Sequence, residues 1–279
     1  MIIDFHTHAL PLRVKNNRSR YVERDAAFAE IYATEKAIIA TADDLIASMD
    51  REGIDISVIV NYGWSTHDFC VETNDYIMES IARYPKRLVG FCAVANYHDN
   101  KSLIEIERCV SGGIKGVGEL RPDTQPPGVV SRERLAPFAQ LLLKHKLILL
   151  THSSEPVGHL YRGKGAATPE RLYKFIASFS GVPVVCAHWG GGLPFYTLMP
   201  EVRQALENVY FDTAISPFLY RPEIYRYVRD LAGADRILFG SDYPAMAPSR
   251  LLKEFDAVEL PDEERAMILS GNARRLLGI

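Results

Sequence analysis

The sequence predicts an α/β protein, a (β/α)8 TIM barrel, and three observations support this prediction. Short apolar, β-branched runs occur eight times along the 279 residues, and a segment with helical spacing follows each of them. Several runs, such as residues 56–60 and 147–150, are apolar almost throughout, as parallel strands covered on both faces are. Eight such units in about 280 residues match the usual size of this barrel. A doubly wound open sheet is the alternative, but no glycine-rich dinucleotide fingerprint follows the first run.

The expected strands alternate with helix signals. Thr41, followed by two acidic residues, predicts a helix start, and Gly53 predicts the end of that helix. Thr168 is an N-cap candidate followed by a proline, Ser131 marks a weaker start, and a final helix is expected over residues 261–277. The strands are expected at residues 2–6, 56–60, 88–94, 114–120, 147–152, 184–188, 209–212 and 237–241.

The chain shows no division into parts. Residues 11–32, which are basic at their start, separate the first strand from the helix near Thr41, and we expect them to form an elaborated loop at the rim. No internal repeat and no break in composition is present. Residues 1–279 are therefore expected to form one domain.

Composition and charge exclude several classes of protein. The 35 Asp and Glu residues outnumber the 32 Lys and Arg residues. This balance argues against a protein that binds nucleic acids or membrane surfaces, because such a protein needs a broad basic surface. No apolar run approaches the roughly 18 residues of a membrane span, and the start of the chain lacks the pattern of a signal peptide. The four cysteines are scattered, which favours reduced thiols. We expect a cytoplasmic enzyme that acts on a small molecule and binds neither nucleic acids nor membranes. Assembly into a homo-oligomer is an open alternative.

Side chains with metal-binding chemistry follow the expected strands at their carboxyl ends, which form the active face of a parallel barrel. His6 and His8 are two apart, so on an extended strand both point the same way. Each residue alone has an ordinary explanation, such as a helix cap or a strand-end hydrogen bond. Together their imidazoles and carboxylates predict a divalent metal site, with zinc as the expected ion. The set is His6, His8, Glu119, His152, His188 and Asp242.

Five of these residues, all except Glu119, belong to a set of motifs that extends over essentially the whole chain. The motifs are Phe5-His6-Thr7-His8, His152, Ala187-His188-Trp189-Gly190-Gly191-Gly192, Asn208-Val209-Tyr210-Phe211-Asp212, Ile237-Leu238-Phe239-Gly240-Ser241-Asp242-Tyr243-Pro244 and Gly271-Asn272-Ala273-Arg274-Arg275-Leu276-Leu277. This set resembles the amidohydrolase superfamily, and within it the amidohydrolase-2 group, which contains the aminocarboxymuconate-semialdehyde decarboxylase-like enzymes. The resemblance implies a distorted, metal-dependent (β/α)8 barrel but does not decide between hydrolysis and decarboxylation.

The resemblance also implies roles for the candidate ligands. The ligands of a single metal in the decarboxylase-like members resemble four residues of this chain, His6, His8, His152 and Asp242. His188 would then help to deprotonate the metal-bound water. In hydrolytic members with two metals, the counterparts of His152 and His188 hold the second ion, and a group on the fourth strand bridges the pair.

Glu119 ends the fourth expected strand, where such a bridge is needed. It resembles the strand-four glutamate of the TatD-like deoxyribonuclease branch. Lys115 has the same side-chain parity, but four residues of strand place it about 13 Å lower in the barrel. Glu119 is therefore expected to be a ligand in a site of one or two ions. The alternative is that Glu119 pairs with Arg121 or binds substrate beside a single metal.

Three basic side chains near this face are candidates for contact with an anionic substrate. Arg121 directly follows the fourth strand, and its guanidinium matches a carboxylate or a phosphate in a two-pronged contact. A structural ion pair is the alternative for Arg121. His159 and Arg162 lie in the long, glycine-punctuated segment of residues 153–165, which we expect to act as a lid.

The leading prediction for function is a metal-dependent hydrolase of a small, anionic ester, lactone or amide that acts through a metal-activated water. Asp242 is expected to carry the proton, and His188 to share the transfer or to stabilise an oxyanion. The alternative is a metal-dependent, non-oxidative decarboxylase of a small unsaturated or aromatic carboxylate. Hydrolysis of nucleic-acid ends, suggested only by Glu119, and a barrel that binds without turnover are the other interpretations.

Overall fold

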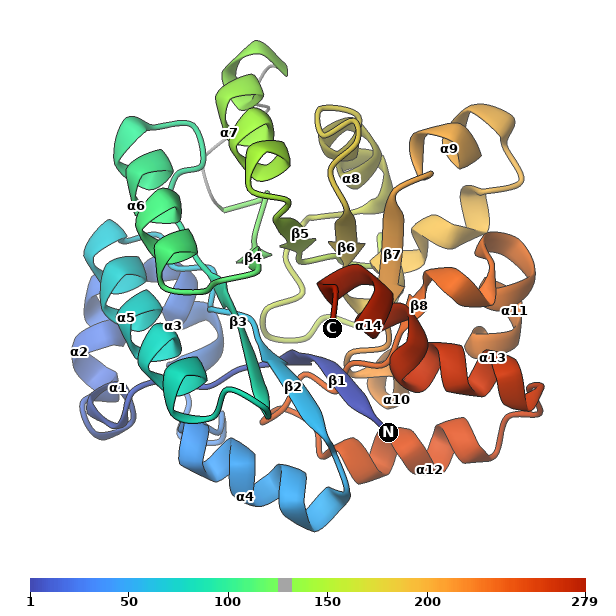
Figure 1. Cartoon of the computed structure of the whole chain (residues 1–279), viewed down its shortest axis with the longest axis horizontal. Helices are drawn as coiled ribbons and strands as arrows, with labels where there is room; N and C mark the ends of the chain where they lie inside the picture. The colour runs from blue at the N-terminus through green and yellow to red at the C-terminus, as the bar shows by residue number, and fades with distance from the viewer. Residues whose placement is uncertain (125–131) are drawn as a thin grey trace.

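The computed structural model describes residues 1–124 and 132–279, and in them the expected (β/α)8 barrel is present (Figure 1). Eight strands follow one another in chain order, and each neighbouring pair is parallel. The ends of the sheet meet irregularly, through backbone hydrogen bonds from Phe5 N to Phe239 O (2.8 Å) and from Asp242 N to His6 O (2.8 Å). The strands are β1 (Ile3–Thr7), β2 (Ile56–Ile59), β3 (Leu88–Cys92), β4 (Gly116–Leu120), β5 (Ile148–Thr151), β6 (Val184–Cys186), β7 (Val209–Asp212) and β8 (Ile237–Leu238).

Five strands (β2, β3, β5, β6 and β8) end earlier than the sequence predicts, and the backbone shows the reason for β6 and β8. β6 stops at Cys186 because His188 and Trp189 adopt left-handed backbone angles (φ 54° and 57°), and the 3-10 segment η1 (His188–Tyr196) begins there. β8 keeps only two residues. In both cases the chain leaves the sheet where a candidate ligand follows, which frees that residue from the strand's side-chain alternation.

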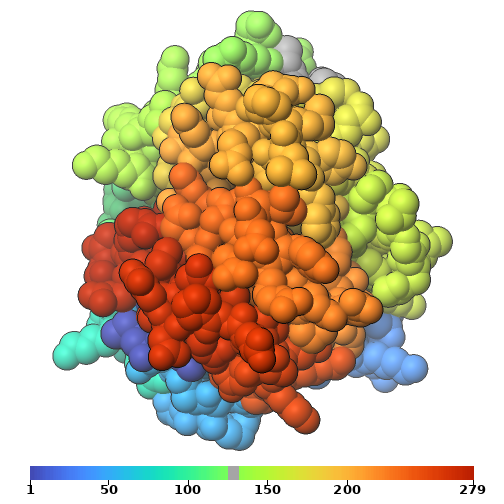
Figure 2. Space-filling view, turned by 90° about the vertical axis from the view of Figure 1, so that its right-hand side faces the viewer, coloured from blue at the N-terminus to red at the C-terminus, as the bar shows by residue number. Residues whose placement is uncertain are grey.

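The helices form the outer layer of the barrel. Figure 2 shows the side on which the helices that follow β7 and β8 cover the sheet. No helix in the described part of the chain is long and apolar enough to cross a membrane. The main outer helices are α4 (Ala42–Glu52), α5 (His67–Arg83), α6 (Asn100–Ser111), α7 (Arg132–Lys144), α8 (Pro169–Ile176), α9 (Pro200–Ala205), α10 (Ser216–Leu219), α11 (Ile224–Ala232), α12 (Pro248–Asp256) and α13 (Asp262–Ala266).

Several helix boundaries confirm the sequence signals. The Thr41 hydroxyl accepts from the Asp44 amide and the Asp44 carboxylate accepts from the Thr41 amide, so the two ends of a capping box are satisfied at the start of α4. Gly53 ends α4 in the left-handed conformation (φ 72°). The start predicted at Ser131 lies outside the described residues.

The sequence predicts one continuous final helix, but the structure divides this helix in two. A π-type turn, η3 (Met267–Gly271), separates α13 from α14 (Asn272–Leu277). The Ile268 carbonyl accepts a hydrogen bond from the Phe239 amide (3.1 Å), so this wider turn ties the helix to the end of β8.

The core inside the barrel leaves one end open. Inward-facing side chains such as Phe5, Phe91 and Leu150 pack together with Ala273 and Leu277 of α14. Figure 1 shows α14 lying across the mouth of the barrel that faces the viewer. Since α14 closes the amino-terminal end of the strands, chemistry is left to the carboxyl end.

The prediction of a loop at residues 11–32 is wrong. This segment folds into three short helices, α1 (Leu12–Asn16), α2 (Arg18–Arg24) and α3 (Ala26–Tyr32). Its apolar residues, among them Phe28 and Tyr32, form a separate cluster with Tyr62 and Trp64 after β2. Asp25 caps α3 through the Phe28 amide (3.0 Å) and also accepts from the amides that follow Trp64. Burial against β2 thus outweighs the basic, loop-like composition.

Candidate active site

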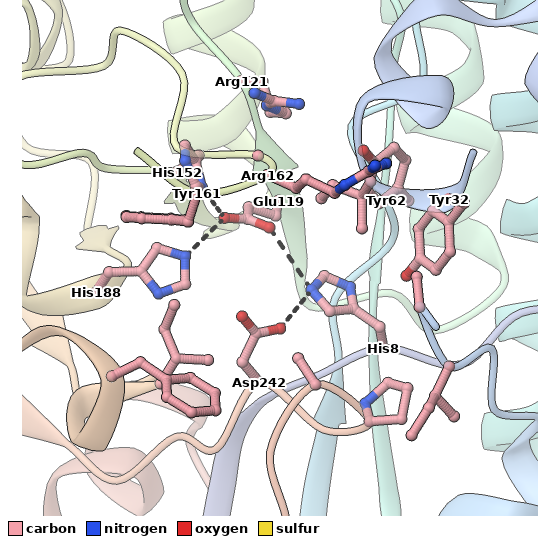
Figure 3. Close-up of a pocket in the computed structure, with 18 of the residues that line it drawn as sticks. His8, Tyr32, Tyr62, Glu119, Arg121, His152, Tyr161, Arg162, His188 and Asp242 are labelled. Carbon is pink, nitrogen blue, oxygen red and sulfur yellow. Dashed lines mark hydrogen bonds and ion pairs between the residues drawn. The ribbon is translucent and has the colours of Figure 1, made fainter. Parts of the chain in front are cut away.

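Six buried or nearly buried side chains converge at the carboxyl end of the barrel (Figure 3). Each arrives from the end of a strand or the first residues after it, which is why residues far apart in sequence meet. The sequence predicts all of them as metal ligands. They are His6 and His8 from β1, Glu119 from β4, His152 after β5, His188 after β6 and Asp242 after β8.

The first group of donors surrounds His8. The Nε2 atoms of His6 and His8 are 3.2 Å apart, and Oε2 of Glu119 lies 3.7 Å from the former and 3.6 Å from the latter. Oδ1 of Asp242 lies 3.2 Å from His8 Nε2. Such a spacing lets one small cation contact all four residues.

The second group shares Glu119 with the first. Its other oxygen, Oε1, lies 2.8 Å from Nδ1 of His152 and 3.7 Å from Nε2 of His188. The structure therefore places His152 beside His188 rather than beside His6 and His8. Glu119 stands between two clusters of ligand atoms, each of which spans no more than 4.8 Å. This is the position that a bridging carboxylate needs.

The donor set fits a divalent transition ion. Imidazole nitrogens and carboxylate oxygens together suit zinc, manganese and similar ions, whereas magnesium and calcium prefer oxygen alone. Two carboxylates also supply the negative charge that offsets a cation in a buried site. The carboxyl end of this barrel is therefore a divalent-metal site.

The charges in the cluster stabilise one another. Burial lowers the pKa of His6, but its ion pairs with Asp212 and Glu119 raise it well above the ordinary value. Burial opposes ionisation of Glu119, but the hydrogen bond from His152 and the ion pair with His188 hold the pKa of its carboxyl well below the usual range. Burial lowers the pKa of His188, but its interaction with Glu119 prevails and raises that pKa to about 9. A metal ion must displace these protons, so its affinity should rise with pH.

Three of the imidazoles are oriented by groups behind them. The second ring nitrogen of His8 lies 3.0 Å from the Val60 carbonyl, and that of His188 lies 3.2 Å from the Ala214 carbonyl. Nδ1 of His6 lies 2.8 Å from Oδ2 of Asp212, the last residue of β7. These contacts leave each Nε2 directed at the site, as in well-ordered metal centres.

Asp212 is a functional residue to which the sequence analysis assigns no role. Its Oδ1 accepts from the amides of His188 (2.9 Å) and Ala214 (3.0 Å), so one fully buried carboxylate orients His6 and holds the chain at His188. The signal was available, because Asp212 ends the seventh strand in the same manner as the ligands end theirs.

We expect Asp212→Asn to lower metal affinity by about 10- to 100-fold, because an amide cannot accept equally from the imidazole and from two backbone amides. Competition with a metal chelator measures this affinity, and circular dichroism verifies the fold. Asp235→Asn, which changes a half-buried aspartate of η2 (Ala234–Arg236) outside the site, is the matched control. Unchanged metal affinity in folded Asp212→Asn protein would contradict the orienting role.

The three glycines after His188 allow the segment that follows β6 to lie close to the segment that carries His152. Gly190, Gly191 and Gly192 all have left-handed φ angles of 58° to 93°. A Cβ on Gly191 would collide with the backbone of Ser154, two residues after His152. The glycine run therefore allows two ligand-bearing segments to touch.

The ligand cluster is the floor of a cavity of about 340 Å³. This volume is near the lower end for ligand pockets, about 300–1,000 Å³, and it indicates a small molecule. Figure 3 shows Arg121 and Arg162 above Glu119, and Tyr32 and Tyr62 beside His8. Apolar side chains, including Ile31, Ile215 and Phe218, complete the wall.

The structure separates the three predicted substrate-binding residues. Arg121 lines the cavity, is almost fully buried and pairs with Glu30 of α3 at 2.6 Å, so the ion-pair interpretation applies to it. Arg162 lines the cavity from the segment after β5. His159 is not among the described residues that line it; its ring packs on Tyr161 (centroids 5.6 Å apart). Tyr32, at the end of α3, and Tyr62, three residues after β2, line the cavity without having been predicted to. Tyr32 was missed because the helix that places it was predicted as a loop.

Fold and site together define a metal-dependent enzyme on a (β/α)8 barrel. Residues 3–279 match the family model described as amidohydrolase, and the chain belongs to this family. The predicted resemblance to its decarboxylase-containing branch is confirmed.

Two relatives and one solved structure that resemble the chain are all named as decarboxylases. The chain is 22% identical to 2-amino-3-carboxymuconate-6-semialdehyde decarboxylase of Dictyostelium discoideum, over 99% of this chain and 91% of the relative. It is 24% identical to gamma-resorcylate decarboxylase of Rhizobium radiobacter, over 73% and 74% of the two chains. A structure of 5-carboxyvanillate decarboxylase from Novosphingobium aromaticivorans, complexed with manganese, superimposes with a TM-score of 0.79 at 17% identity, covering 100% of this chain and 96% of that one.

These comparisons overturn the leading prediction of a hydrolase. The relatives and structures reported above are named as decarboxylases, which favours the alternative, a carbon–carbon lyase. The error has a physical origin. A metal beside carboxylates and imidazoles serves either reaction, and the difference lies in how the substrate is held rather than in the ligand set.

Proposed function

We propose that the chain is a metal-dependent, non-oxidative decarboxylase of a small aromatic or unsaturated carboxylate. The observation that carries this proposal is the cavity itself, because it joins a metal-ligand floor to cationic and apolar walls in about 340 Å³. Such a space suits a flat acid whose carboxylate meets the metal floor and whose carbon skeleton meets Ile215 and Phe218. The decarboxylase names of the relatives support the same reaction.

When bound, the divalent ion supplies positive charge that polarises the substrate oxygens it contacts. His6, His8, Glu119 and Asp242 would hold it, and Asp212 orients His6. We propose manganese or zinc as the resident ion. The imidazoles favour zinc, the carboxylates also suit manganese, and the 5-carboxyvanillate decarboxylase structure contains manganese.

Decarboxylation breaks one carbon–carbon bond, releases carbon dioxide and requires a proton at the carbon left behind. We assign the proton transfer to Asp242, which lines the cavity. Burial raises the pKa of Asp242, but the hydrogen bond from His8 and the charge of His6 lower it overall. Asp242 is therefore ionised before the reaction, and it must take up a proton from water before it can deliver one to the carbon. His188 faces Asp242 across the cavity (Figure 3), and in a site whose single ion is held by the group around His8 its raised pKa would let it present positive charge to the substrate carboxylate.

The remaining predicted contacts complete the proposal. Arg162 and Arg121 are proposed to meet the substrate from the wall above Glu119, and His159 supports the segment that carries Arg162. Four free, buried cysteines support a cytoplasmic location.

Release of carbon dioxide tests the reaction. The metal-loaded protein is offered a panel of benzoates with ortho hydroxyl groups and of unsaturated dicarboxylates, and in parallel a panel of lactones, esters and amides. We expect carbon dioxide release from at least one carboxylate and no hydrolysis. Turnover of a lactone, ester or amide without any decarboxylation would contradict the proposal.

The site is expected to hold one or two ions, and Glu119→Gln distinguishes these cases. If Glu119 bridges two ions, this change reduces the metal bound per chain from about two ions toward one, because a neutral amide is a poorer shared ligand. His6, His8 and Asp242 would retain the remaining ion, and the fold should survive. Elemental analysis after metal loading and desalting measures the ratio, with Glu201→Gln on α9 as the matched control. One ion in the wild-type protein that persists unchanged in Glu119→Gln would show that Glu119 does not bridge two ions.

A further inference from the structure

Arg121 and helix α3 meet at the edge of the cavity. Arg121 directly follows β4, and only 2% of its surface is exposed. Its Nη1 lies 2.6 Å from Oε2 of Glu30, and its Nη2 lies 3.9 Å from Oδ2 of Asp123. The guanidinium that lines the cavity is therefore already neutralised by two carboxylates of the chain itself.

The two carboxylates are held very differently. The Asp123 side chain is 5% exposed and also accepts a hydrogen bond from the Ala166 amide (2.7 Å), which fixes it under the segment after β5. The Glu30 side chain is 44% exposed, so a change of rotamer returns it to water at little cost. Of these two carboxylates, Glu30 is the one that can leave Arg121.

The helix beneath Glu30 stays in place when its side chain moves. Phe28 stacks on Trp64 (centroids 4.6 Å apart) and Tyr32 stacks on Phe28 (4.4 Å). The Tyr62 hydroxyl donates to the Ala27 carbonyl (2.7 Å). These contacts anchor α3 on both sides of Glu30, while the neighbouring Ile31 and Tyr32 line the cavity.

A substrate anion that reaches Arg121 would be the third negative charge around one guanidinium. It is repelled unless one carboxylate withdraws, whereas exchange with Glu30 keeps the charge balanced and can replace a single contact by a two-pronged one. We propose that Glu30 is a specificity-determining residue: an exchangeable counter-ion of Arg121 that a second acidic group of the substrate displaces. This inference rests on the proposed function for the identity of the substrate, but not for the binding that tests it.

Equilibrium binding to the metal-loaded protein tests the exchange without turnover. Benzoate carries one carboxylate, whereas isophthalate and terephthalate carry two at different spacings. Titration calorimetry of the three acids is compared in the wild-type protein and in Glu30→Gln. The control is Glu23→Gln, which removes the same charge from α2, where the structure places no Arg121 contact. Thermal melting verifies that each variant is folded.

Glu30→Gln is expected to bind at least one diacid about fivefold more tightly, because the competing carboxylate is gone, and to bind benzoate as the wild-type protein does. Arg121→Lys should lose the preference for diacids, because an ammonium cannot form the planar contact. Equal changes for all three acids, no change for any, weaker binding of the diacids in Glu30→Gln, or no diacid binding at all would each overturn the proposal. If the pattern holds in a protein that decarboxylates nothing, the exchange stands and the proposed function falls.

Discussion

Asp242→Asn is expected to lose at least about a hundredfold in kcat with little change in KM, the lower range for removal of a general acid–base group. The amide still fills the same space after β8, and its oxygen can still face the metal site. It can neither accept a proton nor deliver one to carbon. The effect should therefore fall on the chemical step rather than on binding.

The measurement compares kcat, KM and metal content for the same preparations. Asp262→Asn, at the exposed first position of α13, makes the same chemical change outside the site and should leave all three unchanged. Near-normal kcat in Asp242→Asn protein with a full complement of metal would remove Asp242 from the proton transfer. Loss of the metal together with the activity would instead make Asp242 essential as a ligand.

Removal of the metal should reduce activity by at least about a thousandfold, since Lewis-acid stabilisation amounts to several kcal/mol. The same treatment should lower the melting temperature, because the buried carboxylates of Glu119 and Asp242 lose the cation that offsets their charge. Manganese or zinc should restore both properties, and calcium should restore neither, because a site rich in imidazole offers it too few oxygens.

Elemental analysis of the chelated protein is the control for complete removal. His145→Gln, which changes a partly buried histidine that follows α7 outside the site, should behave as the wild-type protein does throughout. His8→Gln should fail to regain activity with either ion. Full activity in protein shown to be free of metal would overturn the metal-dependent mechanism.

The local sequence was sufficient for the barrel and for the metal ligands. Strand β5 is apolar up to its last residue, and α4 has its own start signal at Thr41 and its own end signal at Gly53. Both elements can therefore be predicted without knowledge of their neighbours. The ligands could be predicted for a related reason. Residues at the ends of successive parallel strands must meet, so position along the chain is enough to assemble His6, His152 and Asp242 at one face.

The helices of residues 11–32 could not be predicted from the local sequence. These helices are stabilised because Phe28 and Tyr32 pack against Tyr62 and Trp64, which follow β2. The sequence of residues 11–32 does not indicate that these aromatic side chains will be its partners. The same dependence hides Glu30, whose importance comes only from its 2.6 Å contact with Arg121, 91 residues away.

The reaction type also depends on more than the ligands. His6, His8, Glu119, His152, His188 and Asp242 assemble a site that either hydrolysis or decarboxylation can use, and the comparisons with relatives corrected the choice between them. The sequence by itself determined the order of the strands, the starts and ends of several helices, and which side chains gather at the candidate metal site. The tertiary structure alone decided the grouping of His152 with His188, the support of His6 by Asp212 and the shape of the wall above them. Those features are contacts between distant segments, whose free energy appears only when both partners are buried together.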